Sequence, residues 1–255
     1  MFFTNTGKVF QTKAYEIPES SRTAKGQAIV NFLQLSPEEK ITAMIPYNKS
    51  DGYKYLFFTT TAGVVKKTKI EDFDNVRRSG LIAITLDKGD TLNWVQPTSG
   101  TDEIVISTSE GQAISFKESD VRSMGRNAAG VRGIKLKNSD RAIGMDAVIK
   151  GQKGNQLLII SENGYGKRTD LSSYKIQHRG GSGIKTAKVT AKIGKLVGAN
   201  VVNVDDIEGD LLVTSAHGQI IRIPLASISI LGRATQGVRI MRPQPGDKVA
   251  AATVI

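Results

Sequence analysis

Residues 157–170 read LLIISENGYGKRTD, and the order of residue types in this stretch decides the fold. An apolar run leads into a hydroxyl residue, Ser161, and Gly164 follows three positions later. Such apolar runs favour an extended strand, and an Asn-Gly pair suits a tight hairpin turn because glycine adopts positive φ without strain. The stretch therefore predicts two strands joined by a hairpin turn at Gly164.

The same pattern occurs five times along the chain, roughly once every fifty residues. In each copy a hydroxyl residue stands three positions before the turn glycine, and an apolar residue stands five positions before it. This period lies near that of propeller blades and well above that of ankyrin or tetratricopeptide units. Because one repeat cannot bury its own apolar face, the five repeats must pack together. The turn glycines are Gly7, Gly63, Gly111, Gly164 and Gly218, and the hydroxyl residues are Thr4, Thr60, Thr108, Ser161 and Ser215.

Three further features follow the turn glycine at similar distances in each repeat. An apolar residue stands ten positions after it, and we expect this residue in the core, with Tyr15 and Tyr174 as wedges between repeats. A second glycine then precedes a third strand, expected over 28–33, 81–86 and 131–136, and an arginine stands four positions before that glycine in four repeats. The apolar residues are Ile17, Phe73, Val121, Tyr174 and Ile228; the second glycines are Gly26, Gly80, Gly130, Gly183 and Gly237; the arginines are Arg22, Arg126, Arg179 and Arg233.

These elements predict an all-β protein of about five four-stranded, propeller-like blades. A fourth apolar run closes each repeat, as in 142–149 and 196–202, and helical periodicity is almost absent. Since propellers run long as single closed units, we expect one domain over 1–255 with blades at about 1–50, 51–100, 101–152, 153–205 and 206–255.

Composition argues against several classes of site. The chain has no cysteine, which excludes disulfides and thiolate zinc sites and fits a reducing cytoplasm. No apolar run approaches twenty residues and no basic-then-apolar leader occurs, so we expect neither secretion nor a membrane partner. His178 and His217 are the only histidines, which argues against a histidine metal centre or a catalytic triad. We expect no catalytic residue, no metal and no cofactor.

Charge is the second strong signal. The chain has 35 Lys and Arg against 24 Asp and Glu, a formal net charge of +11 that is typical of a protein with a polyanionic partner. The cations recur after the hairpin turn and around the second glycine, so closed packing of the repeats would set them in a cationic track. Each lysine alone is more often only solvated surface, and guanidinium groups also bond carbonyls of a neighbouring turn. The candidate phosphate-contacting residues are Lys8, Lys13, Lys66, Lys67, Arg77, Arg78, Arg126, Arg132, Lys167, Arg168, Lys175, Arg179, Lys185, Lys188, Arg222, Arg233 and Arg239.

Longer blocks of the sequence resemble a known family, repeat by repeat and in order. The blocks are FFTNTGKVFQTKAYEIPES, AKGQAIVNFLQL, KITAMIP, FKESDVRSMGRNAAGVRGIKL, NGYGKRTDLSSY and ISILGRATQGVRIMR, and all resemble the C-terminal domain of the DNA gyrase A subunit. The resemblance implies a β-pinwheel, a propeller-like disc whose blades exchange strands and whose basic rim wraps duplex DNA. It also implies that the catalytic sites lie elsewhere, in an ATP-dependent type IIA topoisomerase formed with the rest of the gyrase A subunit, together with the gyrase B subunit.

The chain departs from that family in one respect. The family usually has six blades, and the first carries a basic box resembling QRRGGKG that is needed for wrapping; we expect this chain to begin after that blade. The nearest string is QHRGGSG at 177–183. Because it stands at the ordinary turn of the fourth repeat, we interpret it as a degenerate relative of the box and not as the box itself. It keeps Gln177, Arg179, Gly180, Gly181 and Gly183, with His178 and Ser182 in place of cations.

Two other functions stay open. A C-terminal domain of the topoisomerase IV type resembles this one, lacks the box and steers the choice of DNA substrate without full wrapping. A propeller scaffold that binds an acidic protein would also need a positive rim. Binding to random duplex DNA that weakens with salt would separate DNA binding from the scaffold.

Overall fold

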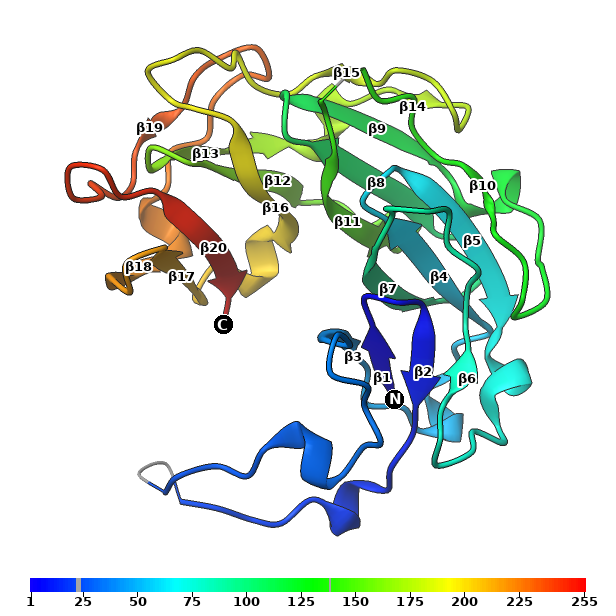
Figure 1. The fold of residues 1–255 in the computed structure, drawn as a ribbon. Coiled ribbons are helices and arrows are strands. Elements are labelled where there is room, and N and C mark those ends of the chain that lie inside the picture. The colour runs from blue at the N-terminus through cyan, green and yellow to red at the C-terminus, as the bar shows by residue number, and fades with distance from the viewer. Residues whose placement is uncertain (22–23, 138) are drawn as a thin grey trace. The chain divides into compact units, whose positions relative to one another are not determined.

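A computed structural model describes residues 1–21, 24–137 and 139–255, so Arg22 lies outside the described residues. The described chain consists of strands, loops and single turns of 3-10 helix (Figure 1), and the predicted all-β class is confirmed. The strands are β1 (Phe2–Thr4), β2 (Lys8–Phe10), β3 (Ile41–Met44), β4 (Tyr55–Thr60), β5 (Val64–Lys69), β6 (Leu81–Ile82), β7 (Leu92–Thr98), β8 (Glu103–Thr108), β9 (Gln112–Lys117), β10 (Val131–Arg132), β11 (Ala142–Val148), β12 (Asn155–Ser161), β13 (Tyr165–Asp170), β14 (Ile176–Gln177), β15 (Ile184–Lys185), β16 (Leu196–Asn203), β17 (Asp210–Ser215), β18 (Ile220–Pro224), β19 (Val238–Arg239) and β20 (Val249–Val254). The helical turns are η1 (Ala14–Glu16), η2 (Ile29–Asn31), η3 (Lys49–Asp51), η4 (Ile70–Phe73), η5 (Glu118–Asp120), η6 (Leu171–Ser173), η7 (Val204–Asp206) and η8 (Leu225–Ser227).

The hydroxyl residue and the turn glycine together close each hairpin. Between β12 and β13 the carbonyl of Ser161 accepts from the amide of Gly164 at 2.9 Å, and its Oγ accepts from the amide of Tyr165 at 3.2 Å. Gly164 has φ 77°, a conformation that a residue with a Cβ adopts only with strain. The same two bonds recur at the other four turns, which explains why this pair of residues marks every repeat.

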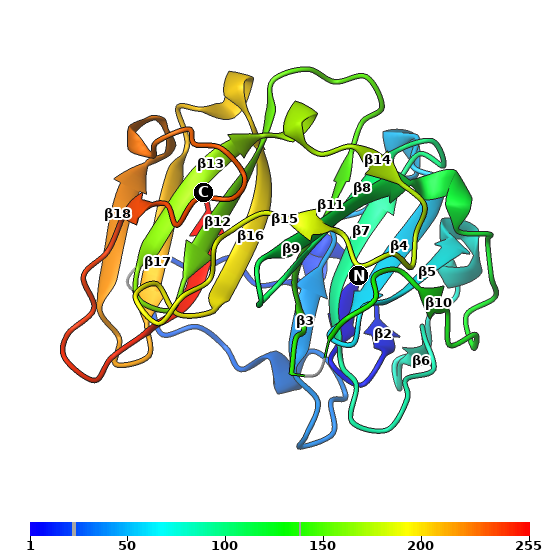
Figure 2. The same ribbon diagram turned by 90° about the horizontal axis from the view of Figure 1, so that it is seen from above.

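Each hairpin lies at the centre of a small sheet. The five sheets have the orders β3-β1-β2-β6, β10-β5-β4-β7, β11-β8-β9-β14 with β15 also on β9, β16-β12-β13-β19, and β18-β17-β20. Figure 2 shows the hairpin β12–β13 flanked by β16 in the fourth sheet. The prediction of four-stranded blades holds for three of the five sheets, whereas the third sheet has five strands and the last has three in the described residues.

Neighbouring repeats exchange strands. The second glycine of a repeat precedes a two-residue strand that pairs with the hairpin of the repeat before it: β6 pairs with β2, β10 with β5, β15 with β9 and β19 with β13. These exchange strands confirm the predicted third strands at 81–86 and 131–136 but are shorter than predicted. The prediction of a strand over 28–33 is wrong, because these residues pair with no hairpin in the described parts of the chain and instead form η2.

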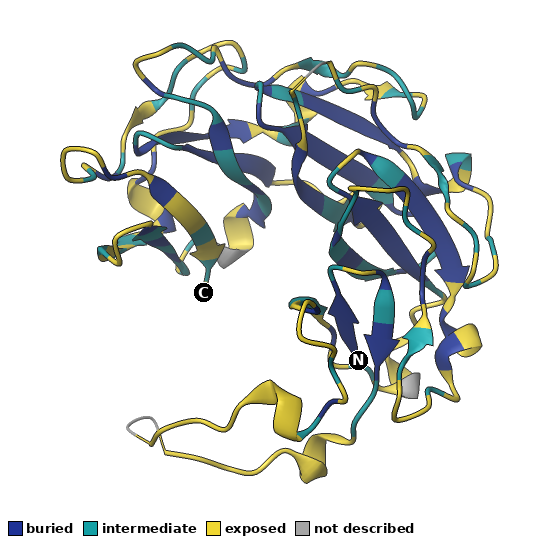
Figure 3. Ribbon diagram, viewed as in Figure 1, coloured by how far each residue is buried: buried dark blue, intermediate teal, exposed yellow. Residues whose placement is uncertain are grey.

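The chain divides into two compact units, which we describe separately. Unit 1 comprises Met1–Gly100 and Val121–Val131, and unit 2 comprises Thr101–Asp120 and Arg132–Ile255. In unit 1 the rings of Phe3, Phe58 and Phe73 pack against one another, with the centroids of Phe3 and Phe58 5.7 Å apart. In unit 2 the core includes Leu157 and Leu211. Figure 3 shows the strands β12 and β13 largely buried. The single domain and its blade limits stay a prediction.

Four of the five apolar residues predicted for the core are buried: Phe73, Val121, Tyr174 and Ile228. The prediction is wrong for the first repeat, where Ile17 is 47% exposed, and Tyr15 is no wedge because it is 84% exposed. Both lie in the segment that lacks a partner hairpin, so no preceding hairpin in the described chain buries them.

Candidate nucleic-acid interface

Three of the four exchange strands, β10, β15 and β19, place one basic side chain each on the surface of unit 2, whereas β6 has Ile82 at that position. Arg132, Lys185 and Arg239 are the second residue of β10, β15 and β19, and all three are exposed. Successive residues of a strand point to opposite faces. The apolar first residue is partly buried in β10 and β15 but exposed in β19, and the basic second residue faces solvent in all three strands. In Figure 1, β15 and β19 lie on the side of unit 2 opposite β11 and β16. We call Arg132, Lys185 and Arg239 the edge cations.

An aromatic ring supports the last of the edge cations. The guanidinium of Arg239 lies over the ring of Tyr165, 4.7 Å from its centroid, and donates to the Tyr165 hydroxyl at 2.6 Å. Lys192 approaches the same ring at 5.5 Å. A cation held over an aromatic face gains about 0.5–1 kcal/mol and keeps its remaining donors for an anion. Lys192 and Tyr165 were not among the residues predicted from the sequence. The position of Tyr165, directly after the turn glycine, was the signal that could have identified it.

Arg233 is held in a similar way. Its guanidinium lies 5.9 Å from the centroid of the Tyr174 ring and donates to the carbonyl of Lys185 at 3.3 Å. Tyr174 is buried, and its hydroxyl is hydrogen-bonded to the hydroxyl of Thr186. Burial raises the pKa of Tyr174, so this ring stays neutral beneath the cation. Arg233 thus lies half-buried beside the edge cation Lys185.

The degenerate box folds as a packed turn. Arg179 donates from Nε to the carbonyl of Asp120 at 2.9 Å and from Nη1 to the carbonyl of Arg132 at 3.1 Å. Of the two interpretations of this arginine, carbonyl bonding is the one the structure shows. Gly181 accepts from the amide of Lys135 at 2.8 Å, and a Cβ on Gly183 would lie 2.6 Å from the carbonyl oxygen of Ala113. Gln177 pairs with Phe116 in the sheet, and the amide of Gly180 donates to the carbonyl of Gly133. His178 and Ser182 are exposed.

Two lysines predicted to contact phosphate are buried instead, which corrects the prediction. Lys66 and Lys167 are 0% exposed, and their ammonium groups donate to backbone carbonyls of a neighbouring turn. Burial lowers the pKa of both lysines to about 8. Neither ammonium reaches the surface, so we leave both out of the interface.

The residue after each of these lysines is also buried. The ammonium of Lys67 lies 4.9 Å from the centroid of the Tyr55 ring. Arg168 donates to the carbonyl of Ile228 and to Oε1 of Gln156, both at 2.9 Å. These two side chains are a second correction, because they bond within the fold and have little surface to offer a phosphate.

The remaining candidates are accessible to different degrees. Lys8 forms an ion pair with Glu39 at 2.9 Å, and the guanidinium of Arg222 binds the carboxylate of Asp210, with Nε at 2.6 Å. A carboxylate partner competes with phosphate, so we rank these two below the others. The exposed candidates are Lys13, Arg77 and Arg78 in unit 1 and Lys175 and Lys188 in unit 2, and Arg126 is half-buried.

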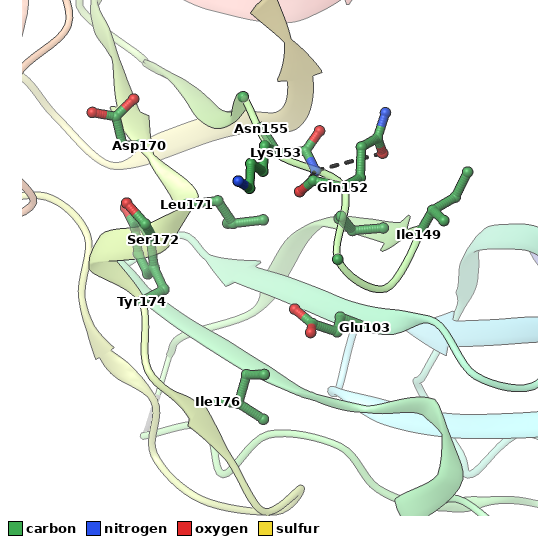
Figure 4. A pocket seen from close by; sticks show the side chains of 13 residues that line it. Glu103, Ile149, Gln152, Lys153, Asn155, Asp170, Leu171, Ser172, Tyr174 and Ile176 are labelled. Atoms are coloured by element: carbon green, nitrogen blue, oxygen red, sulfur yellow. Dashed lines mark hydrogen bonds between the residues drawn. The ribbon is translucent and has the colours of Figure 1, made fainter.

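An open pocket of unit 2 has the opposite charge. Figure 4 shows the carboxylates of Glu103 and Asp170 among its lining residues, with Lys153 as the one basic residue. Nδ2 of Asn155 donates to the carbonyl of Gln152 at 3.1 Å and shapes the loop beside it. A phosphate would meet two carboxylates here, so the pocket lies outside the candidate interface.

Metal clusters and membrane-spanning helices are both absent from the described parts of the chain. Among residues 1–21, 24–137 and 139–255, no group of three or more His, Cys, Asp or Glu side chains is arranged to hold a metal ion. Within the same ranges, no helix has the length and apolarity to cross a membrane.

Comparison with known proteins agrees with the sequence resemblance. A family model described as "DNA gyrase C-terminal domain, beta-propeller" matches residues 1–48, 54–99, 102–149, 155–203 and 209–255. The DNA gyrase A subunit of Staphylococcus epidermidis is 40% identical over 256 residues, and that of Staphylococcus aureus is 41% identical over 255 residues. The alignments cover 100% of this chain, which spans only 28% of the length of each relative.

Two solved structures have the same fold. The crystal structure of the C-terminal domain of DNA topoisomerase IV matches with a TM-score of 0.90 and 25% identity, over 100% of this chain and 78% of that one. The structure of a DNA gyrase A C-terminal domain matches with a TM-score of 0.83 and 26% identity, over 100% of this chain and 81% of that one. Together with the family model and the two relatives, these matches establish that the chain belongs to the DNA gyrase C-terminal domain family.

Proposed function

We propose that this chain binds duplex DNA without reading its base sequence and bends it over the edge cations. The observation that carries the proposal is the recurrence of an exposed basic side chain at one register position of successive exchange strands, Arg132, Lys185 and Arg239. Basic groups that repeat at equivalent positions of a surface can each neutralise a phosphate of the duplex. The names of the relatives support the same partner, because DNA gyrase acts on DNA.

The physics of such an interface is mainly electrostatic. Each phosphate neutralised by Lys or Arg releases counterions, so the affinity falls with salt by a log–log slope of about 0.9 per contact. Bending a short duplex through tens of degrees costs about 1–6 kcal/mol, which several such contacts can offset. Sequence preference then comes only from the ease with which the duplex deforms.

The chain serves DNA gyrase as a part without catalysis of its own. We propose that it acts in the cytoplasm, joined to the rest of the gyrase A subunit, where it works with the gyrase B subunit. Wrapping duplex DNA there would favour the strand passage that introduces negative supercoils in an ATP-dependent reaction. Its basic composition supports this role, since the net charge of +11 attracts a polyanion.

A topoisomerase IV-type role is the second candidate. It is favoured by the TM-score of 0.90 to the topoisomerase IV domain, against 0.83 to the gyrase domain. In that role the chain would bind DNA and steer substrate choice but would not wrap it fully.

Salt titration of binding to random duplex DNA tests the proposal. The triple variant Arg132→Ala, Lys185→Ala, Arg239→Ala should lower the salt slope by about 2.7 if each residue makes one contact. A matched control removes three other exposed cations of unit 2, Lys117, Lys150 and Lys153, and should leave the slope nearly unchanged. Absence of binding at low salt would favour the protein scaffold instead.

Ligation of nicked circles separates wrapping from contact. If the chain wraps DNA, circles sealed in its presence carry a shifted linking number, and the shift grows with protein concentration. Binding with an unchanged topoisomer distribution would favour the topoisomerase IV-type role.

A further inference from the structure

The third residue after the turn glycine differs among the repeats in a way that the fold alone does not require. It is apolar in three repeats, as Phe10, Ile114 and Ile221, and it is a buried lysine in the other two, as Lys66 and Lys167. Burying an ammonium group costs free energy that an apolar side chain at the same position avoids. The two lysines therefore need an explanation beyond filling the core.

Lys167 is fully engaged by one neighbouring turn. Its Nζ donates to the carbonyls of Gly232 and Arg233, both at 2.6 Å, and to Oγ1 of Thr235 at 3.0 Å. An ammonium group has three protons, and these three acceptors use all of them. The group thus fixes the backbone on both sides of Arg233.

Lys66 makes one corresponding contact in unit 1, to the carbonyl of Arg126. Its Nζ donates to the carbonyl of Ala83 at 2.6 Å and to the carbonyl of Arg126. Arg126 and Arg233 are equivalent residues, each four positions before the second glycine of its repeat. Both buried lysines therefore bond the main chain of the same arginine in the repeat pattern.

Backbone bonds define where these turns lie. The amide of Lys188 donates to the carbonyl of Thr235 at 3.1 Å, and the amide of Thr85 donates to that of Ala128 at 3.3 Å. The same bond exists at the third turn, where the amide of Lys135 donates to Gly181 at 2.8 Å. These amides report the position of each turn, with or without a lysine beneath it.

The turn without a lysine is fastened differently. Ile114 occupies the lysine position there, and Arg179 uses its own guanidinium to bond the carbonyls of Asp120 and Arg132. Where a lysine is present, the guanidinium makes fewer of these bonds, since Arg233 donates only to the carbonyl of Lys185, at 3.3 Å. Arg233 lies over the Tyr174 ring, and in the described residues the Arg126 guanidinium has no hydrogen-bond or ion-pair partner.

We propose that Lys66 and Lys167 are positioning residues that hold the two turns by their main chain and so leave Arg126 and Arg233 to contact phosphate. The inference rests on the proposed DNA binding and adds a role for lysines that never touch DNA. It also assigns different roles to equivalent arginines, with Arg179 structural and Arg126 and Arg233 facing DNA.

A double-mutant cycle in the whole chain tests the effect on DNA. Arg233→Ala should lower the salt slope by about 0.9, and Lys167→Met should lower it by a similar amount because the turn shifts. The variant with both changes should bind no more weakly than Arg233→Ala alone, since the lysine acts through the arginine. Additive losses, or no loss with Lys167→Met, would overturn the proposal. Ile114→Met, at the same position of a repeat without the lysine, is the matched control and should leave the slope unchanged.

Amide hydrogen exchange tests the turn without DNA. In Lys167→Met the Lys188 amide should exchange roughly tenfold faster, while the Lys135 amide of the same molecule keeps its rate. Equal protection of Lys188 in the variant and the native chain would overturn the proposal. If Lys167→Met does not fold, Thr235→Val removes one ammonium acceptor from an exposed position and should speed Lys188 in the same direction. If the native chain does not bind DNA, the proposed function fails, and the exchange rates still decide whether the lysine holds the turn.

Discussion

Two turns of unit 2 occupy the same place in the repeat but are fastened in different ways. Residues 177–183 and 231–237 each end in a glycine of positive φ with an arginine four positions before it. The first turn is held by the guanidinium of Arg179, and the second by the ammonium of Lys167 from below. One sequence motif thus serves two purposes, and the residue beneath the turn decides whether its arginine is structural or accessible.

The glycine is the part that the two turns share, and its substitution should have the largest effect. A Cβ would lie 2.6 Å from a backbone carbonyl at both Gly183 and Gly237, and both have positive φ. Gly183→Ala and Gly237→Ala should each lower the free energy of unfolding by about 2–4 kcal/mol, measured by urea denaturation. A loss at only one of them would mean that the two turns do not share this packing.

Replacing the arginines should have opposite effects at the two turns, mainly on stability at Arg179 and mainly on DNA binding at Arg233. Arg179→Ala removes two bonds to carbonyls and should cost about 1–3 kcal/mol of unfolding free energy with little change in the salt slope of DNA binding. Arg233→Ala should change stability by less than about 1 kcal/mol and reduce the slope. Thermal melts and salt titrations of the same two variants measure both quantities. If Arg179→Ala reduced the slope as much as Arg233→Ala, the two turns would have one role.

Sequence reasoning found the features that depend on local geometry. Ser161 and Gly164 predict their hairpin because both bonds that close it lie within five residues. Burial of Lys66 and Lys167 depends instead on the turn of the following repeat, whose carbonyls accept their protons. Buried and exposed cations both follow a turn glycine in the sequence. Position in the repeat alone therefore does not predict which of them contacts the next turn.

The exposed Ile17 is a second case in which the repeat pattern failed to predict burial. Its equivalents Phe73 and Ile228 are buried, and the repeat pattern predicted the same for Ile17. The exchange strands form by pairing with a preceding hairpin, and residues 28–33 have none among the described residues. The pattern thus describes what a segment does when its partner is present, but not whether the partner is there.

A smaller effect is expected where an aromatic ring supports a cation. Tyr165→Leu removes the ring and hydroxyl that hold Arg239 but keeps an apolar side chain in the core. DNA affinity should fall by about 0.5–1 kcal/mol, and the salt slope should stay close to its native value because the charge remains. Binding titrations at two salt concentrations measure both. A slope reduced as in Arg239→Ala would mean that the ring is needed for the contact itself.

The last expected effect concerns pH, and it distinguishes the lysine-held turns from the turn of Arg179. Burial lowers the pKa of Lys66 and of Lys167 to about 8. At Lys66 the charge of Asp72 opposes this shift and that of Arg126 adds to it, and at Lys167 the charge of Arg233 adds to it. Between pH 8 and the ordinary lysine pKa, the unfolded chain binds more protons than the folded chain, so these two lysines make the free energy of unfolding rise with pH.

Below pH 8 the cost of burying the charge is present in full, and it is relieved as each ammonium loses its proton. Urea denaturation of the native chain and of the Lys66→Met, Lys167→Met variant, at pH 7.5 and at pH 9.5, measures the difference between them. The free energy of unfolding of the native chain should rise relative to that of the variant at the higher pH. A gap that does not change with pH would mean that the lysines titrate as they do in water, and that the contrast between the two kinds of turn does not rest on a buried charge.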